Sequence, residues 1–214
     1  MAMNEILTNN DAVAIGRIWS EPQFSHRHFD ENFYIFELCV PRLSENNDII
    51  NIMISDKLCN IEDIQVEEIY EIRGQFRSYN NYSGSGNKLI LVLFAKEILK
   101  GGEESLNEEL KPNSLYLNGY ICKEPVYRTT PFGREITDLL VAVNRAYGKS
   151  DYIPCIAWGR NAKYTSKLLV GDHIELWGRM QSREYSKRLE NDEIVIKKAF
   201  EVSISRINVI EDVL

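Results

Sequence analysis

The sequence has few cysteines and no long apolar run. Four cysteines occur among 214 residues, none in a CxxC pair, and the three histidines do not cluster with them. This spacing argues against a zinc site, and we expect buried, reduced thiols in a cytoplasmic protein. The longest apolar run covers residues 89–95, whereas a membrane helix needs about twenty residues, so we expect no membrane span. The N-terminal segment has no basic region and no apolar stretch, so we expect no secretory signal.

Sequence motifs of common enzyme classes are also missing. The chain contains no GxxxxGKS/T, HExxH, GxSxG or GxGxxG pattern, and its carboxylates are scattered. The glycines at 84 and 86 lack the spacing of a phosphate-binding loop and are better explained as a hairpin tip. Residues distant in sequence could still assemble a Ser/His/Asp site, but no pattern indicates one. We therefore expect no enzyme activity, no metal and no cofactor.

Charge is distributed unevenly along the chain. The formal net charge is −7, from 25 Lys and Arg against 32 Asp and Glu, which by itself argues against a nucleic-acid binder. Residues 1–111 contain 10 basic and 19 acidic side chains, whereas residues 112–214 contain 15 and 13. The first part is therefore strongly acidic and the second is weakly basic. Such asymmetry suggests two units with different roles.

The two parts also resemble each other in sequence. An offset of 103 residues aligns several identities: Gly16 with Gly119, Glu21 with Glu124, Pro22 with Pro125, Phe29 with Phe132, Arg42 with Arg145, and Asp48 with Asp151. After one inserted residue, an offset of 104 aligns Gly74 with Gly178 and Ser78 with Ser182. Identities in one order with a single slip indicate an internal repeat of about one hundred residues rather than coincidence.

Each copy of the repeat is predicted to form five short strands, separated by Gly, Pro, Asn and Asp. In the first copy they cover residues 12–18, 33–40, 49–54, 69–77 and 89–98. In the second copy they cover residues 116–122, 135–144, 152–158, 173–180 and 194–204. Residues 161–169, followed by Gly171, predict a short helix between the third and fourth strands.

This element order predicts an all-β fold of two tandem five-stranded OB-fold barrels, each with a short helix between strands three and four. A sandwich would need more strands and no helix at that place, although other small barrels share the same periodicity. We expect the first OB-fold in residues 1–99 and the second in residues 114–214. The polar segment 100–113, KGGEESLNEELKPN, is predicted to link them.

Aromatic and basic residues alternate in the second copy. Tyr152 and Trp158 are six residues apart in one predicted strand, so their side chains lie on one face, while residues 153, 155 and 157 form a core set on the other. The alternative is that both rings belong to the core. Exposed rings stack on bases, and neighbouring Lys or Arg bind phosphates. The candidate stacking residues are Tyr147, Tyr152, Trp158 and Tyr185, and the candidate phosphate-binding residues are Arg128, Lys149, Arg160, Arg179, Arg183 and Lys187.

The first copy lacks most of this set. Ser44, Ile49 and Ser55 align with Tyr147, Tyr152 and Trp158. Together with the acidic charge, this indicates that the second copy holds nucleic acid and that the first is structural or docks a protein. The alternative is weak binding by a separate cluster of the first copy, formed by Arg73, Arg77, Tyr79 and Tyr82.

The second copy resembles the bacterial single-stranded DNA-binding protein family. The resemblance covers LNGYICKEPVYRTTPFGREITDLLVAVNRAY (117–147), DYIPCIAWGRNAKY (151–164) and GDHIELWGRMQSREY (171–185). It implies an OB-fold that wraps single-stranded DNA without sequence preference. Family stacking positions fall on the four aromatic residues named above, and family basic contacts fall on Arg160, Arg183 and Arg128. Family members commonly present four OB-folds per assembly, so the resemblance implies a homodimer of this chain.

Two functions are therefore in competition. The first is non-specific binding of single-stranded DNA in replication, recombination or repair, with replication or repair proteins as further partners. The second is an OB-fold scaffold that binds replication proteins and contacts DNA little, which the acidic first copy favours. An oligonucleotide-handling enzyme subunit has no support from individual residues.

Overall fold

The computed structural model describes residues 9–42, 46–81, 88–106, 111–188 and 194–211. The side chains at positions 80, 81, 88, 184–188 and 194–197 are outside this description. Twelve strands form one continuous sheet in the order β2-β3-β4-β6-β5-β1-β7-β11-β12-β10-β9-β8. Their bounds are β1 Asn10–Ile18, β2 Gln23–His28, β3 Glu31–Pro41, β4 Asn47–Ser55, β5 Ile69–Asn81, β6 Lys88–Lys100, β7 Asn113–Ile121, β8 Val126–Thr129, β9 Glu135–Asn144, β10 Ser150–Trp158, β11 His173–Arg188 and β12 Ile194–Val209.

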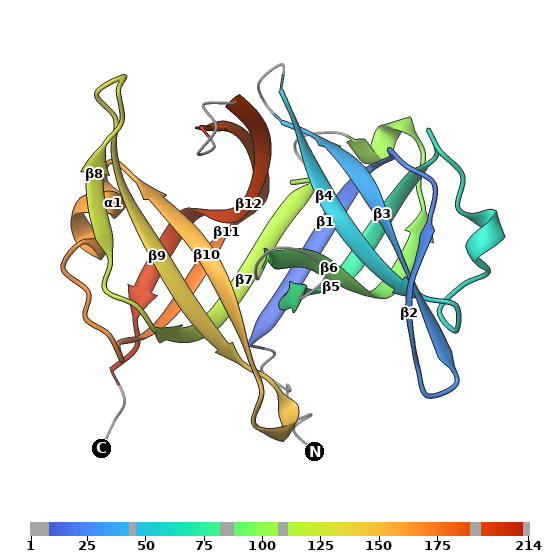
Figure 1. Cartoon of the computed structure of the whole chain (residues 1–214), viewed down its shortest axis with the longest axis horizontal. Helices are drawn as coiled ribbons and strands as arrows, with labels where there is room; N and C mark the ends of the chain where they lie inside the picture. Colours follow the sequence, from blue (N-terminus) through green and yellow to red (C-terminus); the bar gives the residue numbers. More distant parts are fainter. Residues whose placement is uncertain (1–8, 43–45, 82–87, 107–110, 189–193, 212–214) are drawn as a thin grey trace.

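Strands β1–β6, here called the first half, and strands β7–β12, the second half, have the same topology and lie side by side (Figure 1). In each half a parallel pairing closes the barrel, between β4 and β6 at Ile52 and Leu93 and between β10 and β12 at Cys155 and Val202. The additional antiparallel pairings β1–β3 and β7–β9 complete the closure. The predicted all-β fold of two similar OB-fold barrels is confirmed.

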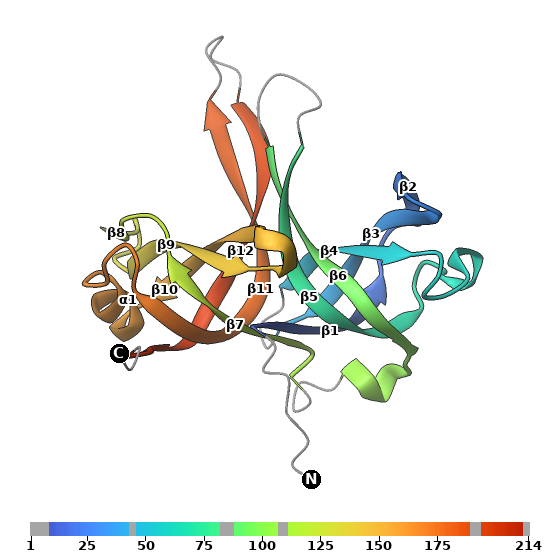
Figure 2. The same ribbon diagram turned by 90° about the horizontal axis from the view of Figure 1, so that it is seen from below.

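The ten predicted strands are present, and each half adds one short strand, β2 or β8, that pairs with the following strand. The predicted helix of the second half is α1, Arg160–Thr165. At the equivalent place the first half has only the 3-10 helix η1, Ile61–Asp63. A second 3-10 helix, η2 at Glu103–Leu106, lies in the predicted linker. Figure 2 shows the β5–β6 and β11–β12 hairpins projecting on the same side of the molecule.

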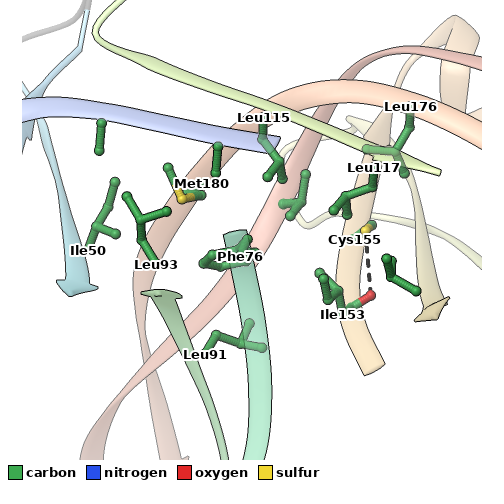
Figure 3. Packing of buried hydrophobic residues seen from close by; sticks show 14 of the residues in the cluster. Ile50, Phe76, Leu91, Leu93, Leu115, Leu117, Ile153, Cys155, Leu176 and Met180 are labelled. Atoms are coloured by element: carbon green, nitrogen blue, oxygen red, sulfur yellow. Dashed lines mark hydrogen bonds between the residues drawn. The ribbon is translucent and has the colours of Figure 1, made fainter. Parts of the chain in front are cut away.

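The core extends across both halves. Alternate residues of the strands point inward, and the buried apolar side chains form one packed cluster that includes residues of each half. In Figure 3, Phe76 and Leu93 of the first half lie close to Leu115 and Met180 of the second. Because apolar burial is the main stabilising contribution to folding, the two halves should support each other's stability.

The halves join through an antiparallel pairing of β1 with β7. Ala12 pairs with Leu115, and these two positions are equivalent in the repeat, so an approximate twofold axis passes between them. Side chains extend the same symmetry. Asn10 exchanges two hydrogen bonds with the backbone of Phe76, donating to O at 2.7 Å and accepting from N at 2.8 Å. Asn113 does the same with Met180, at 2.6 and 2.9 Å.

Each half contains an ion pair with a buried carboxylate, and each pair forms hydrogen bonds to a serine of the other half. Asp151, 1% exposed, pairs with Arg145 and accepts a hydrogen bond from the backbone N–H of Ser78 at 2.6 Å. Arg145 in turn donates to the Ser78 carbonyl at 3.0 Å. The equivalent residues Arg42 and Asp48 bind Ser182 in the same way. The repeated Arg, Asp and Ser identities therefore belong to the junction between the halves.

Candidate nucleic-acid interface

Strand β10 has one face in the barrel and one face toward solvent. Ile153, Cys155 and Ala157 are buried in the core. Tyr152 and Trp158 lie on the opposite face and are 50% and 37% exposed. The spacing of the sequence therefore placed both rings correctly on the outer face. They are two separated aromatic surfaces of the kind on which bases stack.

Tyr147 lies in η4, Ala146–Gly148, the turn between β9 and β10. Its side chain is 99% exposed, and its φ of 60° places it in the left-handed region. That conformation costs about 1–2 kcal/mol for a residue with a Cβ. Gly148, with φ 67°, follows, and the next residue, Lys149, is exposed. Packing against other side chains does not compensate the strain of this conformation. Strained residues of this kind cluster at functional sites.

Two predicted site residues, Tyr185 and Lys187, lie toward the end of β11 in the β11–β12 hairpin. The backbone of Tyr185 pairs with Lys197, and that of Lys187 pairs with Val195. The side chains of both predicted residues lie outside the described residues. Their roles stay predictions.

Two of the predicted phosphate-binding arginines are held by carboxylates. Arg128, on β8, donates from Nε and Nη2 to Asp138 on β9, at 2.6 and 3.2 Å, and this hydrogen bonding raises the pKa of the guanidinium. Arg183, on β11, donates to Glu201 on β12 at 3.1 Å. Glu201 is buried and also accepts from Gln181 at 2.8 Å. Each arginine is roughly half exposed, so it is positioned by its carboxylate and still reaches solvent.

The remaining predicted cations differ in their surroundings. Arg179 donates to Asp48 at 2.6 Å, so it belongs to the junction between the halves. Arg160 begins α1 just beyond Trp158, and both it and Lys149 are exposed. Neither Arg160 nor Lys149 forms an ion pair with any residue that the structure describes. Of the predicted phosphate-binding residues whose side chains are described, these two are therefore the most available.

Sequence reasoning missed several exposed or charged residues of the second half. Phe132 is 93% exposed in the turn between β8 and β9, and Tyr127, on β8, donates to Glu135 at 2.6 Å. That hydrogen bond raises the pKa of Tyr127. It is also the main cause of the lowered pKa of Glu135. The ion-pair partners Asp138 and Glu201 were also missed. The outward position of Asp138 in the alternating pattern of its strand could have indicated this residue. Glu201 could not be found in this way, because it contacts Arg183 only through the pairing of β11 with β12.

The first half differs at the equivalent positions. Ser55, at the place of Trp158, is 8% exposed, and Ile49, at the place of Tyr152, is half-buried. Of the alternative cluster, Arg73 pairs with Glu71, and Tyr79 is half-buried, which raises its pKa. Tyr82 lies outside the described residues. The first half thus has no exposed ring at the positions equivalent to Tyr152 and Trp158.

Other rings do occupy the outer face of the first half, where they pack on one another. His26 stacks on Phe33 with ring centroids 4.9 Å apart and planes inclined by 11°. The ring centroids of Phe33 and Phe94 are 5.9 Å apart, and the guanidinium of Arg77 lies 4.2 Å from the centre of the Phe94 ring. This row of contacts crosses the sheet from β2 to β5 and ends at a cation.

Among the described residues, no arrangement of side chains indicates a metal site or a reactive thiol. They contain no group of three or more His, Cys, Asp or Glu side chains placed to hold a metal ion. The four cysteines, Cys39, Cys59, Cys122 and Cys155, are unpaired, and burial raises the pKa of each thiol. Thiols with raised pKa values are poor nucleophiles. No helix in the described ranges combines the length and apolar character that crossing a membrane requires.

Comparison with known proteins gives a consistent result for the second half. The model of the "Single-strand binding protein family" matches residues 112–209. Single-stranded DNA-binding protein B of Bacillus subtilis (strain 168) is 31% identical over 88 residues, which cover 38% of this chain and 74% of that protein. Single-stranded DNA-binding protein 1 of Staphylococcus aureus (strain COL) is 34% identical over 83 residues, which cover 36% of this chain and 50% of that protein. The chain spans about half the length of most of the curated relatives it matches.

A solved structure extends the likeness to both halves at the level of fold. The wild-type single-stranded DNA binding protein from Thermus aquaticus matches 96% of this chain and 94% of its own chain, with a TM-score of 0.72 and 16% sequence identity. The outward rings of β10, the paired barrels and the matched relatives all indicate the same family. The chain therefore belongs to the single-strand binding protein family.

Proposed function

We propose that this protein binds single-stranded DNA without sequence preference, mainly through the outer face of the second half. The observation that carries the proposal is the exposure of Tyr152 and Trp158 on one face of β10, opposite a complete core face. The printed names of its relatives, which are single-stranded DNA-binding proteins, support it. The proposed ligand needs flat surfaces for unpaired bases and cations for phosphates, and both are found together here.

We expect electrostatic contacts to make a moderate contribution to the free energy of DNA binding. Each base stacked on an aromatic side chain contributes about 1–3 kcal/mol. Lys149 and Arg160 bring cations without a described carboxylate partner, whereas Arg128 and Arg183 must share theirs. Each phosphate contact contributes a slope of about −0.7 to the plot of log affinity against log salt. We therefore propose that stacking dominates affinity and that salt weakens binding less steeply than six free cations would imply.

The experiment that tests the proposal is a fluorescence titration at two salt concentrations. Oligo-dT should quench tryptophan emission, and a duplex of the same length should quench it little. Replacing Trp158 by Phe should remove most of the quench, because Trp19 and Trp177 lie elsewhere in the fold. No response to oligo-dT at low salt would contradict the proposal.

We propose a division of the chain and an assembly that go with this function. Residues 1–99 and 114–214 form the two OB-fold units, joined by residues 100–113, and two chains form a homodimer that presents four units. The support for the dimer is the family resemblance. Sedimentation equilibrium should give about twice the chain mass of 24.8 kDa, and a monomer at all concentrations would contradict this part. The proposed processes are replication, recombination or repair.

A scaffold role is the second candidate, because residues 1–111 carry 19 acidic against 10 basic side chains. In that case replication or repair proteins would bind the acidic half, and DNA would contribute little. A flat oligo-dT titration at low salt, combined with retained folding, would favour the scaffold. Saturable, salt-sensitive quenching would favour DNA binding.

A further inference from the structure

A polar cavity of about 440 Å³ lies at the junction between the halves. It is lined by residues at the start of β1, on β5, and around the end of β9 and the β9–β10 turn, among them Asn9, Gln75, Arg77, Asn144 and Arg145. Strand β5 lies beside the start of β10, where the backbone N–H of residue 152 donates to the Ser78 hydroxyl at 2.7 Å. The cavity therefore presents two guanidinium groups and several amides to one space.

The two guanidinium groups are not equally neutralised. Arg145 is paired with Asp151, which also lines the cavity. Arg77 forms no ion pair with a carboxylate in the described ranges of the chain, and its Nε is buried without a hydrogen-bond partner. Its Nη2 donates to Gln75 at 2.6 Å. Burial, followed by the nearby Arg145, lowers the pKa of Arg77, yet arginine stays protonated at neutral pH. The lining thus carries one positive charge in excess.

The guanidinium at position 77 has no counterpart at the equivalent position 181. The other side of the junction is also positively charged, and its lining includes Arg42, Arg179, Lys111 and Asp48. Gln181 occupies the position in the second half that is equivalent to Arg77, and it donates to Glu201. The sheet register places Val92 opposite Arg77 where Glu201 lies opposite Gln181. The second half therefore has an amide with a carboxylate partner, and the first has a cation facing an apolar residue. Because the Nε atom of Arg77 is closed to solvent, a ligand in the cavity would have to accept from the terminal nitrogens of this guanidinium.

The position of the cavity indicates which ligand fits. Ala146, in its lining, is adjacent to Tyr147, the almost fully exposed ring of the second half. Stacking of Arg77 over Phe94 holds the guanidinium plane in place. We propose that the cavity binds one phosphate group of the DNA backbone, next to a base stacked on Tyr147. This inference rests on the proposed function, and it gives the acidic first half a direct contact with the strand.

The test compares salt titrations of oligo-dT binding by the intact chain. Arg77→Gln introduces the residue found at the equivalent position 181. It should flatten the plot of log affinity against log salt by about 0.7, the value for one phosphate on a single strand, and weaken binding roughly three- to tenfold at low salt. Arg73→Gln is the matched control. Arg73 lies on the same strand, pairs with Glu71 and Glu97, and does not line the cavity, so its slope should equal that of the wild type.

The outcomes separate this inference from the proposed function. A wild-type slope in Arg77→Gln, with normal binding by the unmodified chain, overturns the cavity site and leaves the proposed function intact. Failure of the unmodified chain to bind oligo-dT overturns both. A thermal shift with inorganic phosphate that is lost in Arg77→Gln, together with an unchanged oligo-dT slope, identifies a site for a free anion and overturns the strand contact. Arg77→Gln should lower the melting temperature only slightly, because the lost contact with Phe94 is offset by the removal of a buried N–H that has no partner.

Discussion

Removing the buried carboxylate at position 151 should destabilise both halves of the molecule at once. Asp151 is 1% exposed, pairs with Arg145, and accepts a hydrogen bond from Ser78 of the other half at 2.6 Å. Asp151→Ala leaves the Arg145 guanidinium without its carboxylate and the backbone N–H of Ser78 without its acceptor. Breaking a buried ion pair on one side costs about 3–5 kcal/mol. For a protein of about 200 residues, each kcal/mol lowers the melting temperature by about 2–4 °C, so a decrease of roughly 6–20 °C is expected.

Differential scanning calorimetry measures this effect directly. Because the halves share one core and reciprocal hydrogen bonds, we expect one transition in the wild type and one at lower temperature in Asp151→Ala. Asp138→Ala is the control, since the pair of Asp138 with Arg128 is exposed and contributes at most about 1 kcal/mol. A melting temperature within 2 °C of the wild type for Asp151→Ala, or two separate transitions in the wild type, would refute the coupling of the halves.

Three further predictions concern other features. Asp138→Asn should strengthen oligo-dT binding a few-fold, because Arg128 is released from its carboxylate; weaker binding by anisotropy would contradict this. Gly119→Ala should lower the free energy of unfolding by at least about 2 kcal/mol in a urea titration, because a Cβ there would overlap the Ala142 carbonyl oxygen; an unchanged midpoint would refute the close approach. Cys155 should resist alkylation until the protein unfolds, because it is buried and its pKa is raised; fast labelling in the native state, detected by mass spectrometry, would argue against that burial.

The strands could be predicted because one face of each is in the core. Alternation of apolar and polar residues marked the outer face of β10 correctly, including Tyr152 and Trp158. Strand β2 escaped prediction because all six of its residues, Gln23–His28, are exposed and therefore show no alternation. The helix in the second half ends at Thr165, before the predicted end at 169, since Leu168 and Leu169 lie in the turn that leads to β11.

The electrostatic environment of the site could not be predicted from the sequence. Arg179 meets Asp48 across 131 positions, and this contact exists only because β1 and β7 join the halves. Arg183 and Glu201 meet because β11 and β12 pair antiparallel. The repeat identities were visible in the sequence, but only the paired structure explains that Arg145 and its equivalents hold the junction. The assignment of stacking and phosphate-binding roles stays a prediction.

The most direct measurement is a matched comparison of oligo-dT affinity for Trp158→Ala and Ser55→Ala, which alter equivalent positions in the two halves. Loss of one stacked base, worth about 1–3 kcal/mol, should weaken binding by Trp158→Ala roughly 5- to 150-fold. Ser55→Ala should bind like the wild type, because the Ser55 side chain is buried and offers no ring. Equal affinities for the two variants would contradict binding through the outer face of the second half.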